Sequence, residues 1–100
     1  MKLVRVVGTV VATQKQQKLE GRKLLVVEDV DVAAKPKGTY TVAVDTVGVG
    51  IGEVVLIVAG SSARMTELTR DCPVDATIVG VVDEVEVQGK VTFKKEGRGA

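Results

Sequence analysis

Three glycines at alternate positions form the most suggestive chemical motif in the chain. Gly48, Gly50 and Gly52 could hold a phosphate through backbone amides, as the glycine-rich turn of a dinucleotide-binding fold does. That use requires a helix directly after the glycines, whereas residues 53–59 have the apolar pattern of a strand. The motif therefore predicts a loop in which backbone segments approach each other closely. Copies of this loop from neighbouring subunits are expected to meet around an axis.

A second candidate motif follows that strand, where Gly60-Ser61-Ser62-Ala63-Arg64 resembles the turn that presents a nucleophilic serine. Ala63 stands where this turn needs glycine, and the chain has no histidine to accept the serine proton. The segment instead favours a short helix over residues 63–70, with Ser61 or Ser62 as its N-cap.

Arg64 falls in the first turn of this expected helix, where a cation is mildly unfavourable without a partner. A planar guanidinium suits a bidentate contact with a carboxylate, and Asp45 and Asp75 are the candidate partners. An ordinary solvated arginine is the alternative interpretation.

The residues that are missing exclude several kinds of catalytic and metal site. The chain has no histidine, and Cys72 is its only cysteine, so serine–histidine chemistry, an intrachain disulfide and a cysteine-based zinc site are all excluded within one chain. Two acidic groups lack the glycine-punctuated spacing of a calcium loop, and we interpret them as solvated strand faces: Glu28, Asp29 and Asp31, and Asp83, Glu84 and Glu86. The sequence predicts no catalytic residue, no cofactor and no metal.

The elements around these motifs are strands. Alternating apolar residues predict strands over 3–13, 23–32, 40–47, 53–59, 75–87 and 90–94, with a loop over 33–39 and a hairpin turn at Gln88-Gly89. The first strand is apolar on both faces, which indicates a barrel packed on something outside it or a subunit interface, and Gly8 fits a bend within it. The sum is an all-β fold of five or six strands with one short helix late in the chain, which suits a small barrel of the OB-like type.

Composition limits the function classes further. One hundred residues, 45% hydrophobic and 27% charged with a net charge of +1, indicate one ordinary domain rather than a disordered or polybasic chain. No export signal and no membrane span are expected. Single-strand nucleic-acid binding by an OB-like module stays open as the alternative function, although only 2% of the residues are aromatic and could stack on bases.

Several segments in a fixed order resemble the EutN/CcmL family of bacterial microcompartment vertex proteins. They are Met1 to Leu3, Gly8 to Thr13, Leu24 to Val27, the glycine loop from Asp45 to Glu53, Gly60 to Arg64, and Pro73 to Asp75 leading into Ile78 to Val85. Val49 stands where the family commonly has alanine between two glycines.

The resemblance implies a small closed five-stranded OB-like barrel with one short helix, assembled as a homopentamer that closes the corners of a polyhedral shell in the bacterial cytoplasm. It also implies docking against hexameric shell proteins, no enzymatic activity, and neither nucleic acid nor membrane as a partner. It favours a catabolic compartment of the ethanolamine or glycyl-radical type. The expected domain covers residues 1–95, with a flexible tail over 96–100. Candidate subunit-interface or pore residues are Asp45, Gly48, Gly50, Gly52, Gly60, Ser61, Ser62, Arg64 and Asp75.

Overall fold

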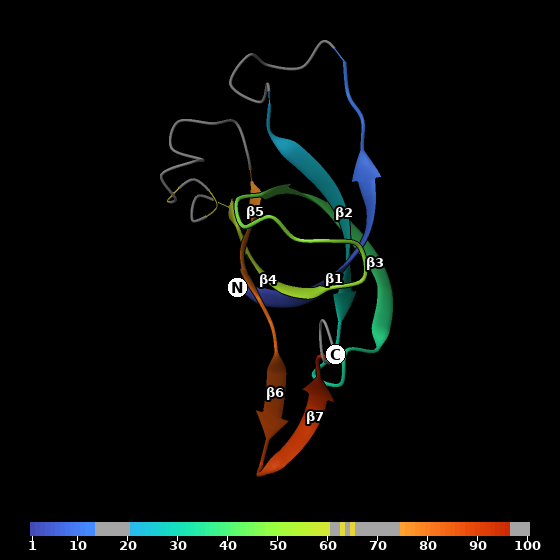
Figure 1. Ribbon diagram of the computed structural model, residues 1–100, viewed down its shortest axis with the longest axis vertical. Helices are drawn as coiled ribbons and strands as arrows, with labels where there is room; N and C mark the ends of the chain where they lie inside the picture. The colour runs from blue at the N-terminus through green and yellow to red at the C-terminus, as the bar shows by residue number, and fades with distance from the viewer. Residues whose placement is uncertain (14–20, 61–62, 64, 66–74, 97–100) are drawn as a thin grey trace.

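The protein is an all-β molecule built from a closed barrel and a small hairpin (Figure 1). The structure, a computed structural model, describes residues 1–13, 21–60, 63, 65 and 75–96. The barrel contains β1 (Lys2–Val10), β2 (Lys23–Val30), β3 (Pro36–Asp45), β4 (Val54–Ala59) and β5 (Ala76–Val81), and the hairpin contains β6 (Glu84–Val87) and β7 (Lys90–Lys94). The predicted closed five-stranded barrel is confirmed.

The barrel closes in the order β1-β2-β3-β5-β4. All neighbouring strands run antiparallel except β3 and β5, which are parallel and pair only at Val44 with Thr77 and Asp45 with Ile78. The β3–β5 pairing is therefore the shortest in the barrel. Asp45 lies in this pairing, at the point where β3 ends and the glycine loop begins.

Alternation along the strands fills the barrel with branched aliphatic side chains, which suit a pleated, half-buried surface. The interior cluster consists of Val4, Val6, Leu25, Val27, Ala43, Val49, Val55, Ile57, Ala76 and Ile78. A second cluster forms where the hairpin joins the barrel, around Val30, Val54 and Val82, with Leu3, Leu56, Val85 and Phe93 packed against it. Part of the outer apolar face of β1 is thus covered by the chain's own hairpin.

Several predicted strand boundaries are wrong. The first three strands end at Val10, Val30 and Asp45 rather than at residues 13, 32 and 47. The single strand expected over 75–87 is divided into β5 and β6 at Val82 and Asp83, because the Val82 amide donates to Val54 O and its side chain enters the second cluster. The loop expected over 33–39 is shorter, since β3 already begins at Pro36, which pairs with Val30.

Two local predictions are confirmed. The register between β1 and β2 shifts between Val6 and Gly8, so the expected bend is a β-bulge. Gln88 and Gly89 both have positive φ, 52° and 81°, as a primed hairpin turn requires. The helix expected over 63–70 lies outside the described residues except for Ala63 and Met65, and the tail expected over 96–100 lies outside them except for Glu96; both stay predictions.

Candidate functional site

The glycine loop after β3, residues 45–53, is organised by the carboxylate of Asp45, and we call it the Asp45 loop. Asp45 Oδ1 accepts hydrogen bonds from the Val47 and Gly48 amides, both at 2.8 Å, and Oδ2 accepts one from the Val49 amide at 2.9 Å. An aspartate that accepts amides of the residues just after it fixes a turn without help from other elements. Asp45 therefore shapes the start of the loop.

Three further amides of the loop donate to acceptors in the loop itself or on β1. Gly50 N donates to Glu53 Oε1 at 2.9 Å, Gly52 N donates to Val6 O at 2.7 Å, and Glu53 N donates to Gly50 O at 3.3 Å. A phosphate cradle needs amides that point outward and are free to donate. The geometry therefore supports the structural interpretation of the three glycines over the phosphate-binding one.

Conformation explains two of these glycines. Gly48 and Gly52 have φ values of 91° and 93°, in the region that side chains with a Cβ rarely adopt. Gly50 has no positive φ, and a Cβ there would lie 3.5 Å from Glu53 Oε1. That distance is an ordinary van der Waals contact, so neither the dihedral angles nor the space around position 50 requires glycine there.

Val49 points inward while its neighbours face outward. Its side chain is 2% exposed and belongs to the barrel interior, whereas Val47 is 45% and Ile51 is 61% exposed. Lys23 Nζ donates to Val49 O at 3.3 Å, and Arg5 Nη1 donates to Gly52 O at 2.6 Å. The loop is therefore pinned by one buried valine and by cations from β2 and β1.

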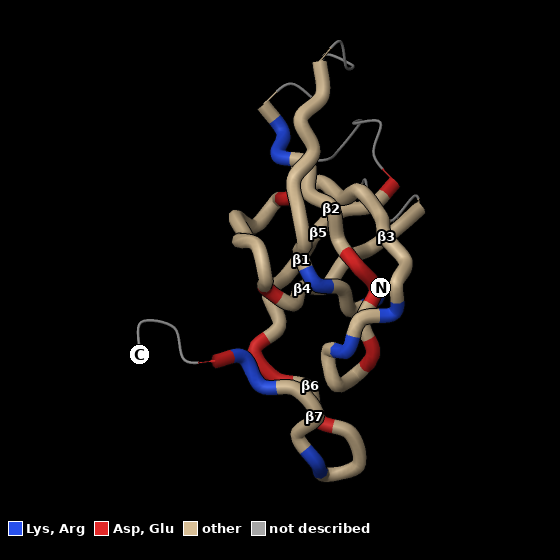
Figure 2. The backbone as a smooth tube through the Cα atoms, turned by 90° about the vertical axis from the view of Figure 1, so that its right-hand side faces the viewer, with Lys and Arg blue, Asp and Glu red and all other residues tan. Residues whose placement is uncertain are grey.

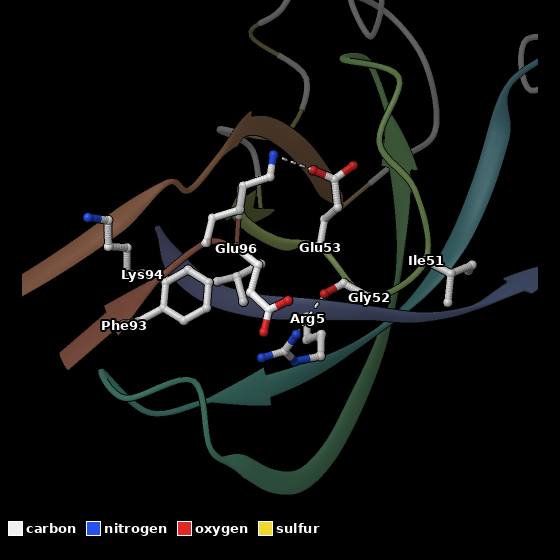
Figure 3. Close-up of a pocket in the computed structure, with 9 residues that line it drawn as sticks. Arg5, Ile51, Gly52, Glu53, Phe93, Lys94 and Glu96 are labelled. Atoms are coloured by element: carbon white, nitrogen blue, oxygen red, sulfur yellow. Dashed lines mark hydrogen bonds and ion pairs between the residues drawn. The ribbon is translucent and has the colours of Figure 1, made fainter. Parts of the chain in front are cut away.

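Beside the loop lies a cleft of about 450 Å³, between β1, the end of the loop and the segment that follows β7 (Figure 3). Lys95 Nζ pairs with Glu53 Oε2 at 2.9 Å across one wall, and the Phe93 ring lines another. Arg5, Lys94 and Glu96 place charges of both signs around it. Its lining holds hydrophobic and charged side chains but no hydroxyl, thiol or imidazole group, so it does not support serine, cysteine or histidine chemistry.

The sequence-predicted site residues fall into two places. Asp45, Gly48, Gly50 and Gly52 lie together in the Asp45 loop. Gly60 and Asp75 meet elsewhere, at the ends of β4 and β5, where the Gly60 amide donates to the Asp75 carbonyl at 2.8 Å.

The expected contacts of Arg64 remain untested, because Ser61, Ser62 and Arg64 lie outside the described residues. Sequence reasoning missed five residues that hold the loop, which are Arg5, Lys23, Val49, Glu53 and Lys95. Only Val49 left a signal in the sequence, as an apolar residue between two glycines.

The surface of the described residues carries little of what single-stranded nucleic acid requires. Of the two aromatic residues in the chain, Phe93 packs against the second hydrophobic cluster, and Tyr40 is 61% exposed. Lysine and arginine are interspersed with aspartate and glutamate along the described backbone (Figure 2). Proteins that bind single-stranded nucleic acid stack the bases on aromatic rings within a positively charged groove. The described residues therefore give no support to nucleic-acid binding as the alternative function.

A separate group of charges lies where β2 turns into β3. Lys2 Nζ is 2.9 Å from Asp29 Oδ1, and the Thr39 hydroxyl donates to Asp29 Oδ2 at 2.6 Å. The Thr39 hydrogen bond and then Lys2 lower the pKa of Asp29. The Lys35 and Ala33 amides, which donate to Asp31, lower the pKa of that carboxyl in the same way.

The described part of the chain holds neither a group of metal ligands nor a membrane-spanning helix. No three histidine, cysteine, aspartate or glutamate side chains gather there in a way that could hold a metal ion. Within the same residues, no helix has the length and apolar character needed to span a membrane.

Comparison with known proteins gives consistent matches over almost the whole chain. The family described as "Ethanolamine utilisation protein EutN/carboxysome" matches residues 1–83. The bacterial microcompartment shell vertex protein EutN of Salmonella typhimurium is 47% identical, covering 95% of this chain and 96% of the relative. The carboxysome shell vertex protein CcmL of Synechocystis is 42% identical, covering 99% of each.

Solved structures agree with these sequence matches. CcmL of Gloeobacter violaceus superposes with a TM-score of 0.92 at 39% identity, covering 97% of this chain and all of the other. The "GrpN pentameric microcompartment shell protein" of Rhodospirillum rubrum superposes with a TM-score of 0.80 at 47% identity, covering 87% of this chain and 99% of the other.

Proposed function

Because the chain belongs to the EutN/CcmL family of microcompartment shell vertex proteins, we propose that it assembles into a homopentamer and closes the corners of a polyhedral shell. One observation carries the proposal: the whole barrel, with the Asp45 loop and hairpin, matches vertex proteins over nearly its full length, and one matched structure is described as pentameric. A cyclic ring buries different patches of each subunit and leaves no unpaired copy.

We propose that the pentamer rim docks against hexameric shell proteins in the bacterial cytoplasm. A shell tiled by hexagons cannot close without pentagons, so the activity is geometric and needs no catalytic group. Gly48, Gly50 and Gly52, or Gly60 with Ser61 and Ser62, line a narrow central opening in this proposal. Small residues suit such a position, because five bulky side chains would collide on the axis.

We further propose that the compartment is catabolic, of the ethanolamine or glycyl-radical type. The segments Gly60 to Arg64 and Ile78 to Val85 support this choice by their resemblance to those branches. The overall identities, 47% to EutN, 48% to GrpN and 42% to CcmL, differ too little to support one branch by themselves.

Electron microscopy of co-expressed shells tests the vertex function. Hexameric shell proteins expressed without this chain should give open tubes or imperfectly closed bodies, and adding the chain should give closed polyhedra. Indistinguishable closed polyhedra in both preparations, with no other vertex protein present, would overturn the proposal. Repeating the experiment with shell proteins of ethanolamine, glycyl-radical and carboxysome compartments tests the type, since efficient closure is expected with one of the first two.

A further inference from the structure

The carboxylate of Glu53 is shared between the Asp45 loop and the base of the β6–β7 hairpin. Its Oε1 accepts the Gly50 amide at 2.9 Å, and its Oε2 lies 2.9 Å from Lys95 Nζ, the pair joined by a dashed line in Figure 3. The Glu53 backbone is fixed on β1, because its carbonyl accepts the Val6 amide at 2.9 Å. Two regions that are distant in sequence therefore depend on the orientation of one side chain.

Lys95 has a second carboxylate close by. Its Nζ lies 2.9 Å from Glu53 Oε2 and 3.9 Å from Asp83 Oδ1. The Asp83 side chain is 85% exposed and the Glu53 side chain is 14% exposed, so only the first carboxylate is well hydrated. A lysine ammonium is a compact charge on a flexible stem, and rotation of that stem carries it from one such partner to the other. Lys95 thus has two positions available, and the structure shows it at Glu53.

The hairpin has few directional contacts with the barrel. Among the described residues, β6 and β7 pair only with each other. Apart from the packing of Val85 and Phe93 in the second hydrophobic cluster, the Thr92 hydroxyl donates to Val32 O. The Lys95 amide closes the base of the hairpin, where it donates to the carbonyl of Asp83, a residue of the same base. A displacement of this base therefore moves Lys95 relative to Glu53.

We propose that Lys95 is a two-position switch through which the hairpin controls the Gly50 amide of the Asp45 loop. With Lys95 at Glu53, the ion pair holds the carboxylate with Oε1 toward Gly50. With Lys95 at Asp83, the Glu53 carboxylate turns toward water and releases the Gly50 amide, while the Asp45 carboxylate keeps the start of the loop in place. Coupling of this kind is reciprocal, so a contact that displaces the hairpin loosens the loop, and a loosened loop frees the hairpin. The switch needs only one chain and is independent of the proposed pentamer.

Amide exchange resolved by residue, measured by NMR on the full chain, tests the switch. Lys95→Met removes the ammonium and keeps an unbranched side chain, so the Gly50 amide should exchange about threefold to tenfold faster, as expected for the loss of one hydrogen bond. The three amides that donate to Asp45 should change by less than about twofold, because their acceptor is untouched. Lys95→Arg should restore the rate of the unmodified protein. Lys95→Gln, a polar neutral variant, should repeat the effect of Lys95→Met and serves if the methionine disturbs folding.

Asp83→Asn tests the second position. Without the competing carboxylate, Lys95 stays at Glu53, so the Gly50 amide should exchange about twofold more slowly than in the unmodified protein. Lys94→Met, from the same segment, is the matched control and should leave the Gly50 rate unchanged.

Native mass spectrometry of each variant separates the switch from the proposed function. A pentamer in which Lys95→Met leaves the Gly50 rate unchanged overturns the switch and leaves the vertex function standing. An equal rise at Gly50 and at the amides held by Asp45 also overturns it, because the whole loop has then loosened. An unchanged Gly50 rate in Asp83→Asn overturns the second position. A monomer in every preparation contradicts the proposed function and leaves the switch standing.

Discussion

The Asp45 loop and the β6–β7 hairpin use the same kinds of residues in opposite ways. In the loop, six amides donate to acceptors within the chain and Val49 is buried in the barrel. In the hairpin, only the base is packed, while valines near the tip are exposed. The loop therefore holds its shape through contacts within the chain, whereas the hairpin is held only at its base.

The largest change in stability is expected when a charge is placed at Val49. We expect Val49→Asp to lower the free energy of unfolding by about 4–5 kcal/mol, because its 2% exposed side chain would bury an unpaired carboxylate. Denaturant unfolding at fixed subunit concentration measures the effect, since oligomer stability depends on concentration.

Ile51→Asp is the matched control from the same loop, as Ile51 is 61% exposed. Its effect on the unfolding free energy should stay within about 0.5 kcal/mol. Equal destabilisation by the two variants would show that Val49 does not anchor the loop.

The next largest loss of stability should come from removing the Asp45 carboxylate, which anchors the loop. We expect Asp45→Ala to cost about 2–3 kcal/mol, since it removes a carboxylate that accepts three amides, of which the Val49 amide is partly buried. Asp83→Ala is the control, because the Asp83 side chain is 85% exposed. Unfolding curves that coincide for the two variants would contradict the anchoring role.

Sequence alone was sufficient for the barrel and for the kind of protein. Alternating apolar residues predicted the strands, the family resemblance implied the closed five-stranded barrel, and the family shown by the comparisons confirms that the chain is a shell vertex protein and not an enzyme. The division of the expected strand 75–87 was not predictable, because residues on both sides of Val82 and Asp83 keep the alternating pattern. What ends β5 is a tertiary contact, the packing of Val82 against the second cluster.

The candidate site was predicted only in outline. The glycines marked the loop and Asp45 was named, but Asp45 was assigned to Arg64 as a partner rather than to the amides that follow it. Arg5 is 47 residues away from Gly52 in sequence, and Lys95 is 42 residues away from Glu53, so no local pattern could connect these partners.

The ion pair between Lys95 and Glu53 connects the segment after β7 to the Asp45 loop. Their side chains are 25% and 14% exposed, so we expect Lys95→Met to cost about 1 kcal/mol, less than a fully buried pair would. Hydrogen exchange should become faster in the hairpin than in the Asp45 loop, because the loop keeps its other anchors. Lys94→Met is the exposed control, and equal exchange in both variants would count against the link.

The smallest change in stability should come from the Asp29 carboxyl, near the end of β2. The Thr39 hydroxyl, and then Lys2, hold the pKa of Asp29 below its ordinary value of 3.8, so Asp29 favours the folded state above that pH. This contribution is lost as the pH falls through the lowered pKa of the folded state. Thr39→Val removes the larger cause and should raise the pKa of Asp29 toward 3.8, which also flattens the acid dependence of stability below that pH. Carboxyl NMR titration measures the shift, with Thr41→Val on the same strand as the control; an Asp29 pKa that does not move in Thr39→Val would show that the hydroxyl does not stabilise the carboxylate.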